Sequence, residues 1–206
     1  MKSGIFITLE GIEGAGKSTA VEIITSFLRS NKIEFIKTRE PGGTEIAEKI
    51  RKLLLEHTQE QMHPATEMLL YFAARAQHLN QLIIPSLNEG KWVICDRFTD
   101  ATYAYQGGGR GIDESKINIL EKWVQDDLRP TYTLLFDIEP ETGMARIKKN
   151  RVLDRLEVEH INFFHMVRER YLARATKEPK RFEIIDANHS LPRVKQQIIS
   201  FLEKII

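Results

Sequence analysis

The 206 residues include 42% hydrophobic and 29% charged side chains, a composition that excludes disordered, collagen-like and low-complexity proteins and predicts one folded domain over residues 1–206. The 30 Lys and Arg residues nearly cancel the 29 Asp and Glu residues, so the formal net charge of +1 creates no overall field to attract nucleic acid or an anionic membrane. The apolar stretch near the N-terminus has about five residues, too few for a signal peptide or a membrane span, which predicts a cytoplasmic protein.

Short apolar runs alternate with longer amphipathic segments along the chain, the pattern of βαβ units. Five strands are expected, at residues 5–9, 34–38, 92–96, 132–137 and 181–186. Between them, apolar side chains recur at helical spacing at Ala20, Ile24, Phe27 and Leu28, at Leu69, Phe72, Ala76, Leu79 and Ile83, and at Val194, Ile198, Leu202 and Ile205. The glycine-rich run at 106–111 predicts a flexible loop after a short helix.

Parallel neighbouring strands need crossover connections, and these place helices on both faces of the sheet. The sequence therefore predicts an α/β fold of three layers, with a five-stranded parallel sheet and helices on both faces. Ligands of such sheets bind beyond the carboxyl ends of the strands, so functional residues are expected at that edge.

A glycine-rich segment follows the first expected strand and leads directly into a helical pattern. It reads Gly11-Ile12-Glu13-Gly14-Ala15-Gly16-Lys17-Ser18, which fits G-x-x-x-x-G-K-[ST] at every fixed position and identifies the architecture as a P-loop fold. Backbone N–H groups of such a loop face phosphate oxygens, and the helix adds its positive N-terminal end. The residues assigned to ATP are Gly11, Ile12, Glu13, Gly14, Ala15, Gly16, Lys17, Ser18 and Thr19.

Two further assignments concern the reacting end of ATP. Lys17 is expected to reach the β and γ phosphates, and Ser18 to bind Mg²⁺. Asp96 ends the third strand at the same edge of the sheet, where its carboxylate would hold a water bound to Mg²⁺. The alternative for Asp96 is a turn or a helix cap.

The remaining motifs narrow the class of P-loop protein. The chain has no D-x-x-G, and its nearest approach to N-K-x-D ends in glutamate at Glu34, which argues against a regulatory GTPase. A small-molecule kinase holds two anionic ligands and needs basic residues on several loops. Candidates for this role are Arg39, Arg51, Arg97, Arg146, Lys148, Lys149, Arg151 and Arg155.

Six segments are specific in their order and spacing. They are Glu10-Gly11-Ile12-Glu13-Gly14-Ala15-Gly16-Lys17-Ser18, Thr38-Arg39-Glu40-Pro41-Gly42-Gly43-Thr44, Tyr71-Phe72-Ala73-Ala74-Arg75, Asp96-Arg97-Phe98, Tyr105-Gln106-Gly107-Gly108-Gly109-Arg110-Gly111 and Leu153-Asp154-Arg155. Together they resemble the bacterial thymidylate kinases over essentially the whole chain. The resemblance implies transfer of the γ-phosphoryl group of Mg-ATP to dTMP, and a homodimer. The alternatives are another nucleoside monophosphate kinase and a non-catalytic nucleotide-binding module.

The resemblance also implies a pocket for dTMP. Phe72 would stack on thymine, and Arg75, which shares its helix face at i+3, would donate a hydrogen bond to O4. Without the family, Phe72 is better explained as a core residue. The family further assigns Gln106 to the base, Tyr105 to the sugar, Arg39 and Arg97 to the phosphate and Glu13 to the sugar and phosphate region, with Glu40, Pro41, Arg51 and Thr102 completing the pocket.

A lid is expected at about residues 146–158. The family pattern there is similar to R-G-x-L-D-R, whereas this chain reads Asn150-Arg151-Val152-Leu153-Asp154-Arg155, so its first arginine is displaced by one position. We expect Arg151 to contact the transferred phosphoryl group, with Arg155 second and Lys149 third. A structural role for Arg155, paired with Asp154 or Glu157, is the alternative. The catalytic residues implied by the resemblance are Lys17, Arg97, Arg151 and Arg155.

Overall fold

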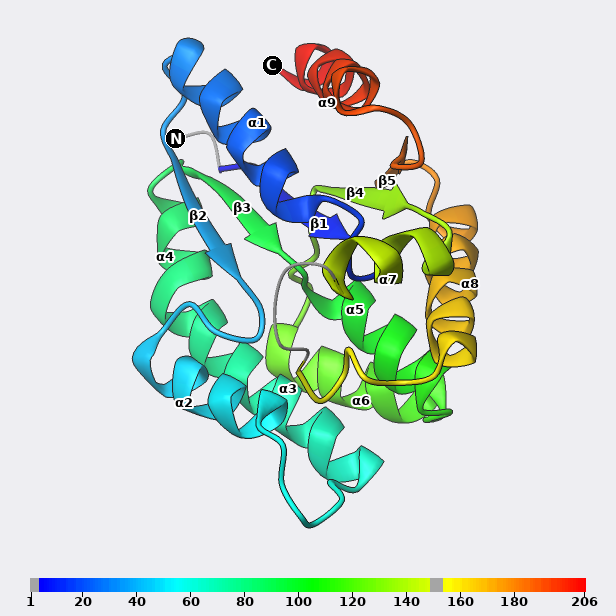
Figure 1. Cartoon of the computed structure of the whole chain (residues 1–206). Coiled ribbons are helices and arrows are strands. Elements are labelled where there is room, and N and C mark those ends of the chain that lie inside the picture. Colours follow the sequence, from blue (N-terminus) through cyan, green and yellow to red (C-terminus); the bar gives the residue numbers. More distant parts are fainter. Residues whose placement is uncertain (1–3, 149–153) are drawn as a thin grey trace.

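The computed structural model describes residues 4–148 and 154–206 and contains a five-stranded sheet whose strand pairs are all parallel (Figure 1). The strands are β1 (Phe6–Glu10), β2 (Phe35–Arg39), β3 (Trp92–Asp96), β4 (Tyr132–Asp137) and β5 (Phe182–Asp186), in the order β2-β3-β1-β4-β5. Each lies within one residue of its expected bounds. The predicted sheet is therefore confirmed.

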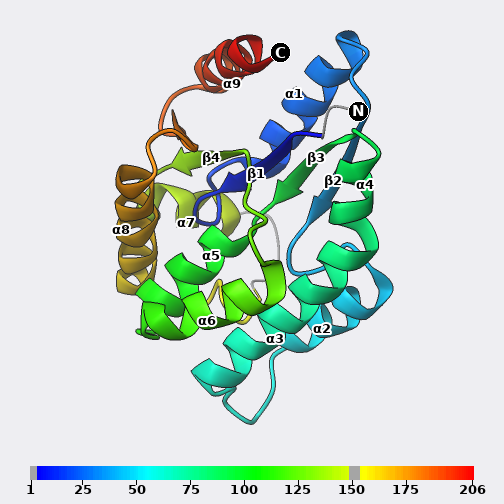
Figure 2. The ribbon, with the colours of Figure 1, turned by 180° about the vertical axis from the view of Figure 1, so that it is seen from behind.

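Helices cover both faces of this sheet, as predicted. They are α1 (Lys17–Ser30), α2 (Glu45–Leu55), α3 (Pro64–His78), η1 (Leu79–Ile83), α4 (Ile84–Asn88), α5 (Thr99–Thr102), η2 (Tyr103–Gly109), α6 (Glu114–Gln125), α7 (Pro140–Lys148), α8 (Ile161–Lys177) and α9 (Leu191–Ile205). Figures 1 and 2 show α1 and α9 together on one face and α3, α4 and α6 on the opposite side. No helix of the described residues is long and apolar enough to cross a membrane.

The alternation of side chains along β1 explains how the two outer layers attach. Ile7 and Leu9 share a buried cluster with Ile24 of α1 and Leu202 of α9. Phe6 belongs to a separate cluster with residues of η1 and α4. Successive side chains of a strand point to opposite faces, so one short apolar strand holds both helix layers.

Two details of the helices differ from the sequence predictions. Leu69 lies half-exposed on α3 rather than in the apolar stripe. The glycine-rich run predicted to be a loop is helical through Gly109, the last residue of η2. A Cβ atom at Gly109 would lie 2.3 Å from the ring of Phe163, and one at Gly108 would lie 2.9 Å from Arg170, both on α8. The glycines therefore permit two helices to pack closely, and the local signal for a loop is overridden by this contact.

Candidate active site

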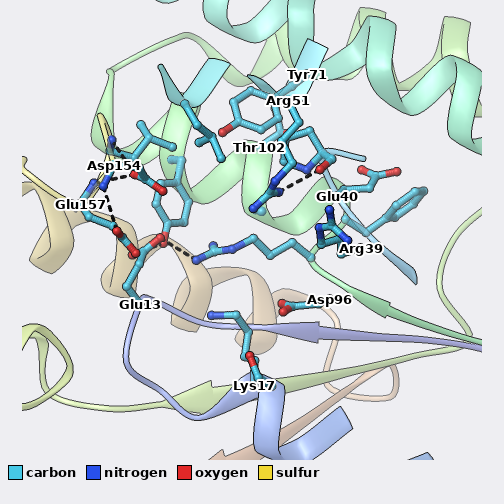
Figure 3. Close-up of a pocket in the computed structure, with 18 of the residues that line it drawn as sticks. Glu13, Lys17, Arg39, Glu40, Arg51, Tyr71, Asp96, Thr102, Asp154 and Glu157 are labelled. Atoms are coloured by element: carbon cyan, nitrogen blue, oxygen red, sulfur yellow. Dashed lines mark hydrogen bonds and ion pairs between the residues drawn. The ribbon is translucent and has the colours of Figure 1, made fainter. Parts of the chain in front are cut away.

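A cavity of about 780 Å³ opens at the carboxyl ends of the strands, where the fold predicts a ligand site. Its walls come from the loop after β1, the loop after β2, α3, the end of β3, η2, α7 and residues just after 153. Figure 3 shows Lys17 and Asp96 on one side of this cavity and Arg51, Tyr71 and Thr102 on the opposite side.

The loop between β1 and α1 has the backbone of a phosphate-binding loop. Gly14 and Gly16 have φ angles of 74° and 90°, in the left-handed region that only glycine enters without strain. Gly14 also touches α7, because a Cβ atom there would lie 2.1 Å from the carbonyl oxygen of Gly143. The loop is thus formed by glycines that allow both its curvature and its contact with α7.

Lys17 begins α1 and is buried beneath this loop. Its Nζ donates hydrogen bonds to the carbonyl oxygens of Gly11 and Ile12, at 2.8 and 2.9 Å. Burial, together with the nearby charge of Arg97, lowers the pKa of Lys17 to about 8. The ammonium group therefore lies where phosphate oxygens would restore its preference for the charged form.

The nine residues assigned to ATP fall into two groups. Glu13, Gly14, Gly16, Lys17, Ser18 and Thr19 line the cavity. Gly11, Ile12 and Ala15 lie behind it, and the last two are part of the hydrophobic core. The backbone of this second group shapes the loop.

A buried carboxylate holds the turn after β3. Glu10 accepts hydrogen bonds from the backbone N–H of Phe98 and from the hydroxyl of Tyr171, both at 2.7 Å. Burial, with a contribution from Asp100, raises the pKa of Glu10 to about 8. Arg97, which directly precedes Phe98, has a φ of 69°, a conformation that a non-glycine residue keeps only when its surroundings impose it.

The side chain of Arg97 is fixed by two residues that the sequence assigned to the same pocket. Its Nη2 donates to Oε1 of Glu13 at 2.7 Å, and its guanidinium lies 4.7 Å from the centre of the Tyr105 ring. The hydroxyl of Tyr105 donates to the other oxygen of Glu13, also at 2.7 Å. Three predicted residues thus form one cluster beside the phosphate loop.

Asp96 tests whether the site suits a magnesium ion. Its Oδ1 is buried and has no hydrogen-bond partner among residues 4–148 and 154–206. Asp96 and Ser18 both line the cavity, and carboxylate and hydroxyl oxygens are hard ligands of the kind that Mg²⁺ prefers. These residues fit the ion.

Arg75 lies at the other end of the cavity with one nitrogen unused. Its Nε donates to Oε2 of Glu40 at 2.7 Å and its Nη2 to Oγ1 of Thr102 at 3.1 Å. Its Nη1 is buried and has no partner among the described residues. The second oxygen of Glu40 lies 3.0 Å from Nδ1 of the buried His78. The guanidinium is therefore held rigidly with one donor available.

The centre of the Phe72 ring lies 4.9 Å from the guanidinium carbon of Arg75, as their i,i+3 spacing predicts, and stacking of a base on this ring stays a prediction. Phe72 is 2% exposed, packs with Met68, Tyr103 and Ile117, and does not line the cavity. Tyr71 lines it instead (Figure 3). Tyr71 lies one helical turn before Arg75 at i,i+4, so α3 presents aromatic residues near this arginine at both helical spacings.

The remaining pocket residues are held by contacts with neighbouring segments of the chain. Arg39 pairs with Glu48 of α2 at 2.8 Å, and Nη1 of Arg51 donates to the carbonyl oxygen of Pro41 at 2.9 Å. The peptide bond between Glu40 and Pro41 is cis. Gln106 lines the cavity and donates from Nε2 to Glu67, a buried residue of α3 that the sequence analysis missed. The apolar surroundings of Glu67 in the sequence gave no sign of its role.

Only some of the residues expected in a lid are among the described residues. Arg151 and Lys149 lie outside the described residues. Arg155 is turned away from the cavity, because its Nη2 pairs with Glu67 at 2.6 Å and its Nε donates to the carbonyl oxygen of Leu54 at 2.9 Å. Glu67 is thus a partner of Arg155 that the sequence did not indicate.

A phosphate loop and a second polar pocket that share one cavity at the edge of a parallel sheet define a P-loop kinase. The family model for thymidylate kinase matches residues 9–198, so the chain belongs to the thymidylate kinase family.

Individual relatives agree with this placement. The chain is 53% identical to thymidylate kinase of Pseudomonas fluorescens over 99% of its own length and 97% of that protein's length. It is 49% identical to thymidylate kinase of Nitrosomonas europaea, over 98% and 94% of the two chains. The crystal structure of thymidylate kinase from Ehrlichia chaffeensis superposes with a TM-score of 0.76 at 33% identity, covering 97% of this chain and 99% of that one.

The lowered pKa of Lys17 gives a test of the phosphate loop. Because polyphosphate stabilises the charged amine, binding of Mg-ATP above the free pKa of about 8 should take up a proton and weaken as pH rises. Titration calorimetry at about pH 8.5, in buffers of different ionisation enthalpy, should show this uptake and find little of it at about pH 7. The control variant Lys49→Met, on the exposed side of α2, should keep the proton uptake. If the uptake persists in Lys17→Met, the assignment of Lys17 to the phosphates is wrong.

Proposed function

We propose that this chain phosphorylates dTMP to dTDP with the γ-phosphate of Mg-ATP. The observation that carries the proposal is the buried, unpaired Nη1 of Arg75 in a cavity shared with the phosphate loop. A guanidinium only donates hydrogen bonds, so it suits the O4 atom of thymine and not the amino group of cytosine. The proposal includes a cytoplasmic location, in which an ATP-dependent kinase has access to its phosphoryl donor.

The pocket around Arg75 divides the acceptor nucleotide among separate elements. Phe72, whose ring centre lies 4.9 Å from the guanidinium carbon of Arg75, would stack on the base, with Tyr71 on the cavity wall and Gln106 at the base edge. Tyr105 lies against the sugar. Arg39, Arg51 and Arg97 approach the cavity from three different elements, as binding of a dianionic phosphate requires.

Catalysis would depend on position and charge rather than on a base. The attacking phosphate oxygen of a nucleoside monophosphate is already ionised near neutral pH, so Lys17 and Arg97 need only align the two phosphates and neutralise the charge on the moving group. Ser18 and Asp96 would hold Mg²⁺, which supplies further neutralisation of phosphate charge when bound. The proposal assigns the lid contact to Arg151, and then to Arg155 if it leaves Glu67.

A coupled assay of ADP release tests this function directly, with dTMP, dUMP, UMP, CMP and AMP as acceptors. We expect dTMP to give the highest kcat/KM. Turnover of UMP or AMP without dTMP would favour another nucleoside monophosphate kinase. ATP binding without turnover of any acceptor would favour a nucleotide-binding module.

Removing the guanidinium of Arg75 should weaken binding of dTMP and leave binding of ATP unchanged. Arg75→Ala should raise the KM for dTMP by about 10- to 100-fold, the range for loss of a hydrogen bond from a charged group, and leave the KM for ATP nearly unchanged. Arg193→Ala, on the exposed surface of α9, is the matched control and should change neither constant. An equal rise in both KM values for Arg75→Ala would defeat the assignment.

We also propose that the chain forms a homodimer. Ile119 and Trp123 of α6 are 67% and 78% exposed, and the neighbouring helices α2 and α3 expose Leu53 and Leu69. Figure 2 shows these three helices next to one another at the surface. Apolar side chains on adjacent helices favour burial against a second copy.

A charged residue at the most exposed aromatic position tests this interface. Trp123→Glu should shift the mass measured by light scattering after size exclusion from dimer toward monomer, because it would bury an unpaired charge. Leu191→Glu, an equally drastic change on exposed α9, should leave the mass unchanged. A monomeric wild-type chain would refute the dimer.

A further inference from the structure

Glu67 is a buried acidic residue of α3 that the proposed chemistry leaves unused. It is 1% exposed, and all its partners come from later segments of the chain. Its Oε1 accepts from Nε2 of Gln106 at 2.8 Å and from Nε of Arg110 at 3.4 Å. Its Oε2 accepts from Arg155 at 2.6 Å and from Nη2 of Arg110 at 3.4 Å. Glu67 therefore joins a cavity residue to two arginines.

The bond to Gln106 settles which way its amide faces. A carboxylate flanked by arginines accepts hydrogen bonds and does not donate them, so the amide nitrogen must face Glu67. The carbonyl oxygen of Gln106 is then the end left for the cavity, which this residue lines. Among the described residues, Oε1 of Gln106 forms no hydrogen bond. The glutamine thus offers an acceptor to a ligand rather than a donor.

This acceptor complements the free donor of Arg75. Thymine carries an acceptor, O4, beside a donor, N3–H, on one edge of its ring. Cytosine carries the reverse, an amino group beside an unprotonated N3. A pocket with the donor Nη1 of Arg75 and the acceptor Oε1 of Gln106 matches the first edge and opposes the second at both atoms.

We propose that Glu67 is a specificity-positioning residue, which fixes the amide of Gln106 so that the pocket reads N3–H of the base. This inference rests on the proposed function, since it concerns the same acceptor pocket. Glu67 does not contact the base and acts only through Gln106. Two buried carboxylates therefore determine which base edge the pocket recognises. Glu40 holds the donor Arg75 in place, and Glu67 holds the acceptor Gln106 in place.

The substitution Glu67→Gln should reverse the orientation of the neighbouring amide. Arg155 lies closest to the side chain of residue 67, so the remaining carbonyl oxygen of the variant should face Arg155 and its new amide nitrogen should face Gln106. Gln106 would then accept through Oε1 and turn its own NH₂ group to the cavity. That group repels N3–H of thymine and suits N3 of cytosine.

The measurement is the ratio of kcat/KM for dTMP to that for dCMP. This ratio should fall by about 10-fold in Glu67→Gln, the effect of one buried hydrogen bond being replaced by a mismatch. The ratio of dTMP to dUMP should not change, because both bases have the same edge. Arg110→Gln is the matched control: it removes an ion pair of Glu67, keeps the bond to Gln106 and should preserve the dTMP to dCMP ratio.

A double-mutant cycle separates positioning from a purely structural role. In a Gln106→Leu background there is no amide to orient, so Glu67→Gln should leave the dTMP to dCMP ratio within about 2-fold. The proposal is overturned if Glu67→Gln lowers both activities equally, or if it changes the ratio as strongly in the Leu background. Failure of the wild-type chain to phosphorylate dTMP would instead refute the proposed function itself.

Discussion

The arrangement of the cavity depends on the hydrogen bonds that Glu10 accepts at the end of β1. They tie the backbone of Phe98, just after β3, to Tyr171 of α8. Arg97, directly before Phe98, keeps a strained backbone conformation, and its side chain donates hydrogen bonds to Glu13 and to the hydroxyl of Tyr171. A carboxylate removed from water resists ionisation, and burial raises the pKa of Glu10 to about 8. Burial of Glu10 therefore costs free energy of folding, and in return the position of Arg97 is fixed.

The same arrangement recurs at the acceptor end of the cavity. Glu40 is buried against Arg75 and His78, and Glu67 is buried against Gln106 and Arg155. In each case a buried acidic side chain accepts a hydrogen bond from a cavity residue, Arg75 or Gln106, and so fixes its orientation. Positive charges that meet a nucleotide would otherwise repel one another and sample many rotamers. Buried acidic residues reduce the repulsion between these positive charges and restrict their rotamers. They also balance the basic residues of the cavity, in agreement with the net charge of +1.

The sheet and the phosphate loop could be predicted from the sequence because their signals are local. A short apolar strand, a glycine loop and a helix follow one another, and each has its own pattern. Features that depend on contacts between distant segments were missed. The sequence did not single out Tyr71, and only the packing of α3 places this side chain on the cavity wall. Gly109 is loop-forming by composition and helical because α8 packs against it. Glu67 acquires its role from partners at least 39 positions away.

The contact between the phosphate loop and α7 leaves no space for a side chain on either surface. A Cβ atom at Gly143 would lie 2.5 Å from the carbonyl oxygen of Glu13, just as one at Gly14 would strike Gly143. Backbone pressed on backbone transmits displacement without the slack that flexible side chains introduce. The phosphate loop, at the end of β1, and α7, which follows β4, are therefore fitted to each other through backbone atoms, so a side chain added at either glycine would push the two segments apart.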